Sequence, residues 1–359
     1  MELKCKPDFD ATLKRFEAWW DRQIIDRPPV SIRTTSDRPV PWPEKQHATL
    51  RDRWLDAEFS VDIMEAEAEG GVFLGDSYPR YEPCLGPELT ATLFGCELEF
   101  TPGTSFSIPI AKSCRAILDM KPDLDTFYWN NIRRKTDLAI ERGRGKWITG
   151  LPDLHTNGDL VAALRDPEGM CLDLADDPAS VRAACDHVNE RFTTIFDDLY
   201  QRLARAGLPC TSWVPALTMG RAYPVSCDFI CMISPKMFQD AILPSLYDEI
   251  RWLDRSIYHL DGPGALRHLD ALLDLPELDG IQWVYGAGNE PARKWIDVYK
   301  RIQAAGKSIQ LLGTDIADTV AVCEHLRPEG VWLCPGGTYS RAETEEFLAW
   351  AGKWAAGKR

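Results

Sequence analysis

The sequence of 359 residues lacks several features that mark common functional classes. None of its eleven cysteines forms a C-x-x-C pair, so neither a disulfide scaffold nor a zinc ribbon is indicated. We expect most thiols to be small buried groups in a reducing, cytoplasmic compartment. Lysine and arginine number 41 against 55 aspartates and glutamates, and the net charge of −14 argues against a nucleic-acid partner.

Long apolar runs are missing too. No stretch approaches the roughly eighteen apolar residues of a membrane span. The opening residues, MELKCKPDFDATLKRF, contain no apolar signal segment, so we expect no membrane association. A glycine-rich phosphate loop is also absent, since the nearest segment, GAGNEP at 286–291, has no third glycine and comes late in the chain. An open doubly wound sheet with a dinucleotide site is therefore disfavoured.

What the sequence does contain is an alternation of short apolar runs with amphipathic stretches, the pattern of a parallel sheet. Eight runs have this character, at 30–34, 71–75, 147–151, 210–214, 256–260, 280–286, 308–313 and 330–334. Helices are expected around them at 9–25, 53–69, 123–142, 179–206, 235–254, 264–273, 292–305, 316–326 and 341–356. Ser340 and Glu343 resemble a capping box at the start of the last helix.

Eight such strands predict an α/β protein of the (β/α)8 TIM-barrel class. Irregular, partly Pro-rich stretches at 38–47 and 78–95 indicate long loops over the C-terminal mouth of the barrel. Since no repeat or linker divides the chain, we expect a single domain over residues 1–359. Its N-terminal extension of strands, helices and loops covers about 1–110, and the barrel core about 111–359.

Chemistry in such a barrel belongs at the C-terminal ends of the strands. Candidate catalytic residues there are Asp153, His155, Asp228, His259, Asp261 and Glu290. Candidate substrate-binding residues are Trp213, Cys227, Trp283, Tyr285 and Asp315. Asp315 is more readily explained as a helix cap, and Asp261, before Gly-Pro-Gly, is equally well explained as a turn former. His259 stands out because it lies within an apolar strand, where an imidazole without a partner costs free energy.

His259 and Asp261 also suggest a metal site. They are two residues apart on a strand, so both side chains point to the same face. Cys334 ends the last predicted strand, and histidine, carboxylate and cysteine are all zinc ligands. The predicted metal ligands are therefore His259, Asp261 and Cys334. Long-range triples of these residue types are common, so the spacing by itself leaves a metal-free site open.

Four segments resemble the uroporphyrinogen decarboxylase superfamily, which includes the corrinoid-linked methyltransferases and is related to cobalamin-independent methionine synthase. The resemblance runs from about residue 80 to the end and implies a (β/α)8 barrel, with a homodimer as the default assembly. The segments are YPRYEPCLGPELTATLFGCELEF, LRDPEGMCLDLADDPASVRAACDHV, SCDFICMISPKMFQDAILPSLYDEI and SIYHLDG.

In the methyltransferase branch a His-x-Cys pair and a distant cysteine bind a zinc ion that holds a thiol substrate as thiolate. The resemblance implies that His259 takes the place of the histidine and Cys334 that of the distant cysteine. Asp261 stands where the first cysteine would be. A carboxylate in that place makes the zinc less electron-rich and a bound thiolate a poorer nucleophile.

The leading functional hypothesis is zinc-dependent methyl transfer between a corrinoid or a methylated small molecule and a thiol, with Asp228 or Asp153 orienting the substrate. The corrinoid implies a corrinoid protein as a partner. One alternative is a metal-free hydrolase or lyase that uses paired carboxylates on a carbohydrate-like substrate, and another is a non-catalytic binding barrel. Porphyrin decarboxylation is disfavoured because the arginines at 27–39 lack the tight arrangement of the decarboxylase branch.

Overall fold

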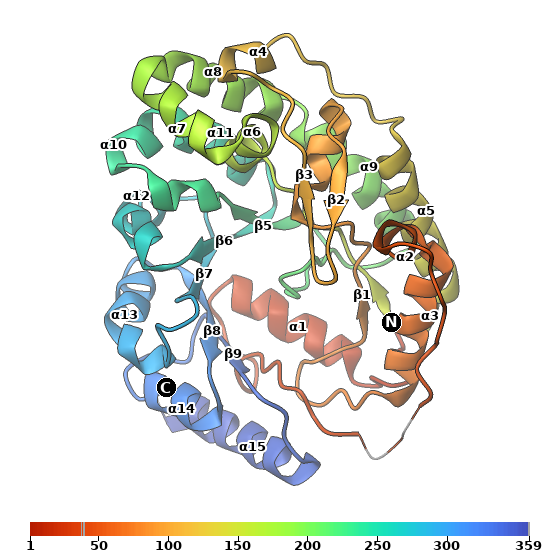
Figure 1. Cartoon of the computed structure of the whole chain (residues 1–359). Coiled ribbons are helices and arrows are strands. Elements are labelled where there is room, and N and C mark those ends of the chain that lie inside the picture. The colour runs from red at the N-terminus through yellow and green to blue at the C-terminus, as the bar shows by residue number, and fades with distance from the viewer. Residues whose placement is uncertain (37, 39, 358–359) are drawn as a thin grey trace.

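The structure, a computed structural model, describes residues 1–36, 38 and 40–357 and has both helices and sheets (Figure 1). The predicted α/β class is confirmed. The strands are β1 (Arg80–Tyr81), β2 (Leu98–Phe100), β3 (Ser105–Ser107), β4 (Ile148–Thr149), β5 (Ala222–Ser226), β6 (Arg255–Asp261), β7 (Gly280–Val284), β8 (Ser308–Gly313) and β9 (Val331–Pro335).

Helices account for most of the remaining regular structure. The α-helices are α1 (Phe9–Trp20), α2 (Leu50–Leu55), α3 (Ala57–Gly70), α4 (Cys114–Ile117), α5 (Phe127–Arg142), α6 (Asn157–Arg165), α7 (Pro167–Asp176), α8 (Pro178–Asn189), α9 (Phe192–Arg205), α10 (Pro235–Met237), α11 (Leu243–Trp252), α12 (Leu269–Leu273), α13 (Ile296–Ala304), α14 (Ile316–Cys323) and α15 (Arg341–Gly357). The 3-10 or π segments are η1 (Pro87–Phe94), η2 (Asp228–Met232), η3 (Phe238–Ile242), η4 (Pro263–His268) and η5 (Ala292–Trp295).

Strands β5 to β9 form one parallel sheet in chain order. Their sequences are rich in branched and aromatic residues and are buried almost throughout, as parallel strands are when packing covers both faces. Figure 1 shows α12 to α15 along one side of these strands and α1 along the other. The predicted strands at 256–260, 280–286, 308–313 and 330–334 are confirmed, with small shifts at their ends.

The first half of the chain contributes shorter pairings. Residues 29–35 run parallel to β9, where the N–H of Ser31 donates to the carbonyl of Leu333. Strand β1 pairs in parallel with β4, and β2 forms an antiparallel pair with β3. Just beyond β4, the N–H of Leu151 donates to the carbonyl of Thr211. The described strands thus form three separate sheets rather than one continuous eight-stranded ladder.

Two predicted strands are corrected by the structure. Residues 71–75 make antiparallel bridges to 31–34, and Gly75, at φ 64°, begins the turn that follows them. The parallel partner of β4 is instead β1, inside the 78–95 stretch that was expected to be a loop. The run at 210–214 makes an antiparallel bridge at Cys210, and the parallel strand comes later as β5. The sequence pattern missed β5 because it contains Pro224, a residue that strands disfavour.

Most predicted helices are confirmed, although several are divided. The stretch at 53–69 contains the break between α2 and α3, where Asp56 caps α3 by accepting from the N–H of Phe59. The stretch at 179–206 contains two helices, α8 and α9. The capping box at the last helix is confirmed, because Ser340 and Glu343 exchange side-chain to backbone hydrogen bonds. Residues 37 and 39 lie outside the described residues. Both belong to the 27–39 stretch, and residue 39 also belongs to the 38–47 stretch.

One large apolar cluster fills the interior and ties α1 to the sheet. Trp332 of β9 packs edge-on against Phe16 and Trp19 of α1, with ring centroids 5.0 and 5.6 Å apart.

In the part of the chain that the structure describes, no helix has both the length and the apolar character needed to cross a membrane.

Buried carboxylates fasten the loops that follow the strands. Asp318 has no exposed side-chain surface and accepts the N–H groups of Ala292, Arg293 and Thr314 at 2.8 to 3.0 Å. Burial by itself raises the pKa of Asp318, but these donors outweigh it and hold the pKa below its ordinary value. The Asp318 charge therefore stabilises the folded chain.

We expect Asp318→Asn to lower the free energy of unfolding by about 2 kcal/mol, because the amide cannot accept all three N–H groups and leaves a buried donor unpaired. Urea denaturation measures the loss. Asp270→Asn, which removes an exposed ion pair with Arg301, is the control and should change stability by no more than about 0.5 kcal/mol. Equal effects of the two substitutions would contradict this account of Asp318.

A second buried carboxyl group predicts a pH dependence of stability. Glu249 of α11 is buried, accepts hydrogen bonds from Thr156 and Asn157 at the start of α6, and burial raises its pKa from 4.5 to about 8. Between these two pH values the folded protein holds a proton that the unfolded chain releases. Stability is therefore lost as the pH rises through this window.

Glu249→Gln removes the ionisable group while keeping an acceptor for Thr156. The difference in free energy of unfolding, variant minus wild type, should grow between pH 4.5 and pH 8 and level off above it. Urea denaturation at a series of pH values measures it. A difference that stays constant across this range would show that Glu249 is already ionised in the folded protein.

Candidate metal centre

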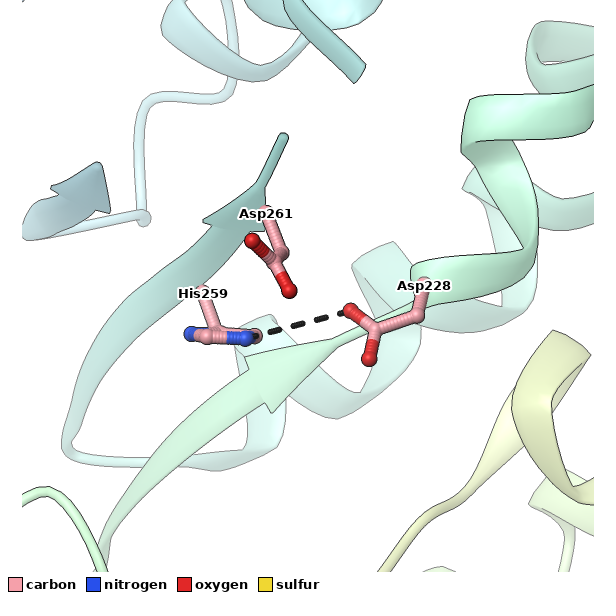
Figure 2. Close-up of side chains that lie close together, drawn as sticks. All are labelled: Asp228, His259 and Asp261. Carbon is pink, nitrogen blue, oxygen red and sulfur yellow. Dashed lines mark ion pairs between the residues drawn. The ribbon is translucent and has the colours of Figure 1, made fainter. Parts of the chain in front are cut away.

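Three side chains with metal-binding atoms converge at the ends of β5 and β6. Strand alternation puts His259 and Asp261 on the same face of β6, and the segment after β5 brings Asp228 opposite them (Figure 2). A ligand atom from each of the three lies within 4.8 Å of those from the other two. His259 Nε2 and Asp228 Oδ1 are 3.9 Å apart. Three residues predicted from the sequence therefore share one place in the fold.

Asp159 holds the backbone that carries Asp228. The N–H groups of Asp228 and Phe229 donate to the two carboxylate oxygens of Asp159 at 2.9 and 3.0 Å. Asp159 is buried in the first turn of α6, so its position is set by the helix. The Asp228 side chain itself is 50% exposed. The backbone beneath Asp228 is thus fixed while its carboxylate remains accessible.

The ring of His259 is held on two sides. Its Nδ1 is hydrogen-bonded to Oε1 of Gln282 on β7, and the indole of Trp213 meets it edge-on with centroids 4.9 Å apart. An amide oxygen only accepts, so Nδ1 carries a hydrogen, and in the neutral ring Nε2 therefore has a free lone pair. Nε2 is the nitrogen that faces Asp228. The imidazole is therefore oriented as a ligand, with its donor atom toward the two carboxylates.

The charges around this group favour a cation. Burial is the largest cause that raises the pKa of Asp228, and the nearby carboxylates of Asp159 and Asp261 raise it further, while His259 and His155 oppose the shift. The carboxylates of Asp228, Asp159 and Asp261 thus lie close enough together to repel one another when ionised. A bound positive ion stabilises the ionised form of each carboxylate.

Asp153 and His155 form a second titratable pair next to the first group. His155 Nε2 lies 3.7 Å from Asp153 Oδ2, and the hydroxyl of Tyr223 donates to Asp153 Oδ1 at 3.5 Å. Burial raises the pKa of Asp153 to about 6, although His155 and His259 oppose the shift. Burial lowers the pKa of His155, but the surrounding carboxylates, Asp153 first, outweigh it and raise the pKa. His259 is one of the charges that act on the pKa of Asp153, and Asp228 is one of those that act on the pKa of His155.

Cys334, the third predicted metal ligand, lies outside this group. Its Sγ accepts a hydrogen bond from Nε2 of Gln310 at 3.7 Å, and burial raises its pKa to about 12. Strand β9 is separated from β6 by two strands, each spacing being about 4.8 Å, and glutamine side chains occupy the space between them. Asp228 completes the group in the place where Cys334 was expected.

The other predicted residues have different surroundings. Trp283 is fully buried on the face of β7 opposite Gln282, and it packs against Trp295. Alternation along the strand accounts for this placement, so Trp283 offers no surface to a substrate. Cys227 is buried beside Gly158. Trp213, by contrast, does reach the site, at the ring of His259.

Three more candidates lie at the following strand ends. Asp315 caps α14 by accepting from the N–H of Asp318, the structural role that the sequence favoured. The hydroxyl of Tyr285 donates to the carbonyl of Leu312. Glu290 is exposed and is not among the three residues whose ligand atoms converge.

Sequence reasoning did not single out Gln282 and Gln310 as site residues. A signal was present, because Gln282 is the one polar side chain in the run GIQWV, and Gln310 lies between apolar neighbours in the run SIQLLG. The role of Asp159 in holding the Asp228 backbone depends on the tertiary fold, because the two residues are 69 positions apart in the chain.

Comparison with known proteins bears on the fold. No protein-family model matches the sequence, and neither does any curated protein. Among solved structures, the chain is similar to a methyltransferase from Methanosarcina mazei, with a TM-score of 0.60 and 16% identity over 95% of this chain and 98% of that one. A B12-independent methionine synthase from a Shewanella species is more remote, with a TM-score of 0.46 and 8% identity over 93% and 97% of the chains. The likeness to the methyltransferase shows that the two chains share a fold.

Proposed function

We propose that this protein is a zinc-dependent methyltransferase that moves a methyl group between a corrinoid or a methylated small molecule and a thiol. The observation that carries the proposal is the convergence of Asp228, His259 and Asp261, with ligand atoms within 4.8 Å of one another. The methyltransferase fold supports it. A corrinoid protein as the methyl donor or acceptor and a homodimeric assembly are parts of the same proposal.

We also propose that the parallel strands close into a (β/α)8 barrel around this site. The pairing of residues 29–35 with β9 supports closure at one end of the five-stranded sheet. Beyond the other end, β1 pairs with β4, and Leu151 donates to Thr211. In such a barrel the ligands lie at the C-terminal ends of the strands, where barrel enzymes carry out their chemistry.

The side chains present fit zinc. One imidazole nitrogen and two carboxylate oxygens are accepted zinc donors, and three protein ligands leave the fourth position open for a substrate. The tautomer of His259 is set by Gln282, so that Nε2 is available. Asp228 is half exposed, which gives a substrate access to the open position. The donor set contains no thiolate, in keeping with Asp261 at the place of a cysteine.

A bound zinc ion lowers the pKa of a coordinated thiol and so favours the thiolate that accepts a methyl group. The protein's own residues then have to take up the thiol proton. Asp153 suits this role because its pKa of about 6 lies near neutral pH, and His155, 3.7 Å away, favours its ionised form electrostatically. Trp213 shields one side of His259 from water.

Metal binding gives the most direct test. Protein purified without chelator should contain zinc, and His259→Ala should weaken zinc binding by more than the roughly ten- to hundredfold loss that follows removal of an outer-shell partner. Competition with a chromophoric chelator measures the dissociation constant. His325→Ala, at an exposed histidine, is the matched control and should leave zinc binding unchanged. Zinc binding that survives His259→Ala, or its absence from the wild type, would refute the proposed centre.

The identity of the third ligand is tested separately. Asp228→Asn should weaken zinc binding strongly, whereas Cys334→Ser should have a much smaller effect, because Cys334 lies outside the converging group. The same chelator competition measures both. The reverse order of effects would assign the metal to His259, Asp261 and Cys334, the set expected from the sequence.

Asp153 predicts a pH profile. With methylcobalamin and a small thiol as substrates, the rate should fall as the pH drops through about 6, because Asp153 then becomes protonated. Asp153→Asn should lower the rate at neutral pH by about 10²- to 10⁴-fold, should abolish this acidic limb and should leave zinc affinity nearly unchanged. An unaltered pH profile in the variant would exclude Asp153 as the proton acceptor.

A further inference from the structure

A row of hydrogen-bonded side chains leads from His259 across the sheet. Gln282 on β7 and Gln310 on β8 are 6% and 4% exposed, and Nε2 of Gln282 donates to Oε1 of Gln310 at 2.7 Å. At the far end, Nε2 of Gln310 donates to Sγ of Cys334 on β9 at 3.7 Å. At the near end, Oε1 of Gln282 accepts from Nδ1 of His259.

The sheet register produces this row. His259 is the Cα partner of Gln282, and Gln282 is the Cα partner of Gln310. Because partners in parallel strands point to the same face, all three side chains lie side by side. Cys334 is two residues beyond Trp332, the partner of Gln310, and therefore shares that face. Four successive strands thus each contribute one member.

The direction of the bonds has a consequence for the histidine. A glutamine amide has one end that donates and one that accepts. Since the donating end of Gln282 is engaged by Gln310, its accepting end is presented to His259. The neutral ring of His259 must then carry its hydrogen on Nδ1. The lone pair of Nε2, on the side of Asp228 and Asp261, is left free to bind a metal ion. Gln310 keeps Gln282 from turning over, because its Oε1 accepts the amide hydrogen of Gln282.

We propose that Gln282 and Gln310 are positioning residues that hold His259 in the Nδ1–H tautomer and aim its Nε2 at the metal. Cys334 is the end of this row rather than a ligand. The inference rests on the proposed metal centre. It explains why two amides occupy an interior where apolar side chains would pack without needing partners.

The tautomer is measured in metal-free protein, independently of zinc and of activity. Two-bond ¹H–¹⁵N correlation spectra should show His259 with a hydrogen on Nδ1 and a bare Nε2. Gln282→Met, which keeps the length of the side chain but removes its accepting oxygen, should abolish this single-tautomer signature. Gln303→Met is the matched control, because Gln303 also makes two hydrogen bonds, to Arg327, far along the chain from His259.

Zinc affinity provides the second readout. Gln282→Met should weaken zinc binding by about ten- to hundredfold, and Gln310→Met should cause a smaller loss, because it acts only through Gln282. Gln282→Glu should restore the affinity, since a carboxylate accepts from Nδ1 and the Gln310 amide can turn to donate to it while accepting from the Cys334 thiol. Urea denaturation of each metal-free variant identifies losses caused by unfolding.

The outcomes separate this inference from the proposed function. Wild-type protein that binds zinc through His259, together with a Gln282→Met variant of unchanged affinity and unchanged tautomer, overturns the inference alone. Wild-type protein that binds no zinc overturns the proposed function, and the tautomer spectra of the metal-free proteins still decide whether Gln282 positions the ring. Loss of the tautomer in Gln282→Met but not in Gln303→Met supports the inference in either case.

Discussion

The register of the parallel sheet is the constraint on which the rest of the site depends. Pairing of β5, β6, β7 and β8 aligns Ser226, His259, Gln282 and Gln310 in one row. A shift of one residue in any strand would turn its polar side chain to the helix-covered face. The row of hydrogen bonds that links His259 through Gln282 and Gln310 to Cys334 forms only in this register. The orientation of the imidazole therefore depends on the backbone pairing.

Carboxylates act in two different ways in this protein. The carboxylate oxygens of Asp159 and Asp318 accept hydrogen bonds from backbone N–H groups and so fix the loops that follow the strands. Asp228 and Asp153 instead lie near His259 and His155, and burial is the largest cause that raises their pKa values. The first kind holds the scaffold still, and the second kind would supply the metal ligand and the proton acceptor of the proposed reaction. That reaction would need both kinds, because ligands and proton acceptor must keep their places.

Much of the fold could be predicted from the sequence, and the failures have physical causes. Runs such as SIQLLG and GVWLC are buried on both faces, and such continuous apolar runs predict parallel strands. The predictions at 71–75 and 210–214 failed because apolar composition does not fix chain direction, and both segments make antiparallel bridges. Strand β5 was missed because Pro224 argues against a strand locally, although its neighbours tolerate it.

By itself the sequence determined that His259 and Asp261 share a face, because alternation along a strand is a local property. It also determined the α/β class, through the order of its apolar runs. That Asp228 rather than Cys334 lies beside them depends on the three-dimensional fold, since ligand groups meet through the positions of strands and loops distant in the chain. Tertiary structure also decided the tautomer of His259, because Gln282 and Gln310 become its neighbours only when the strands pair.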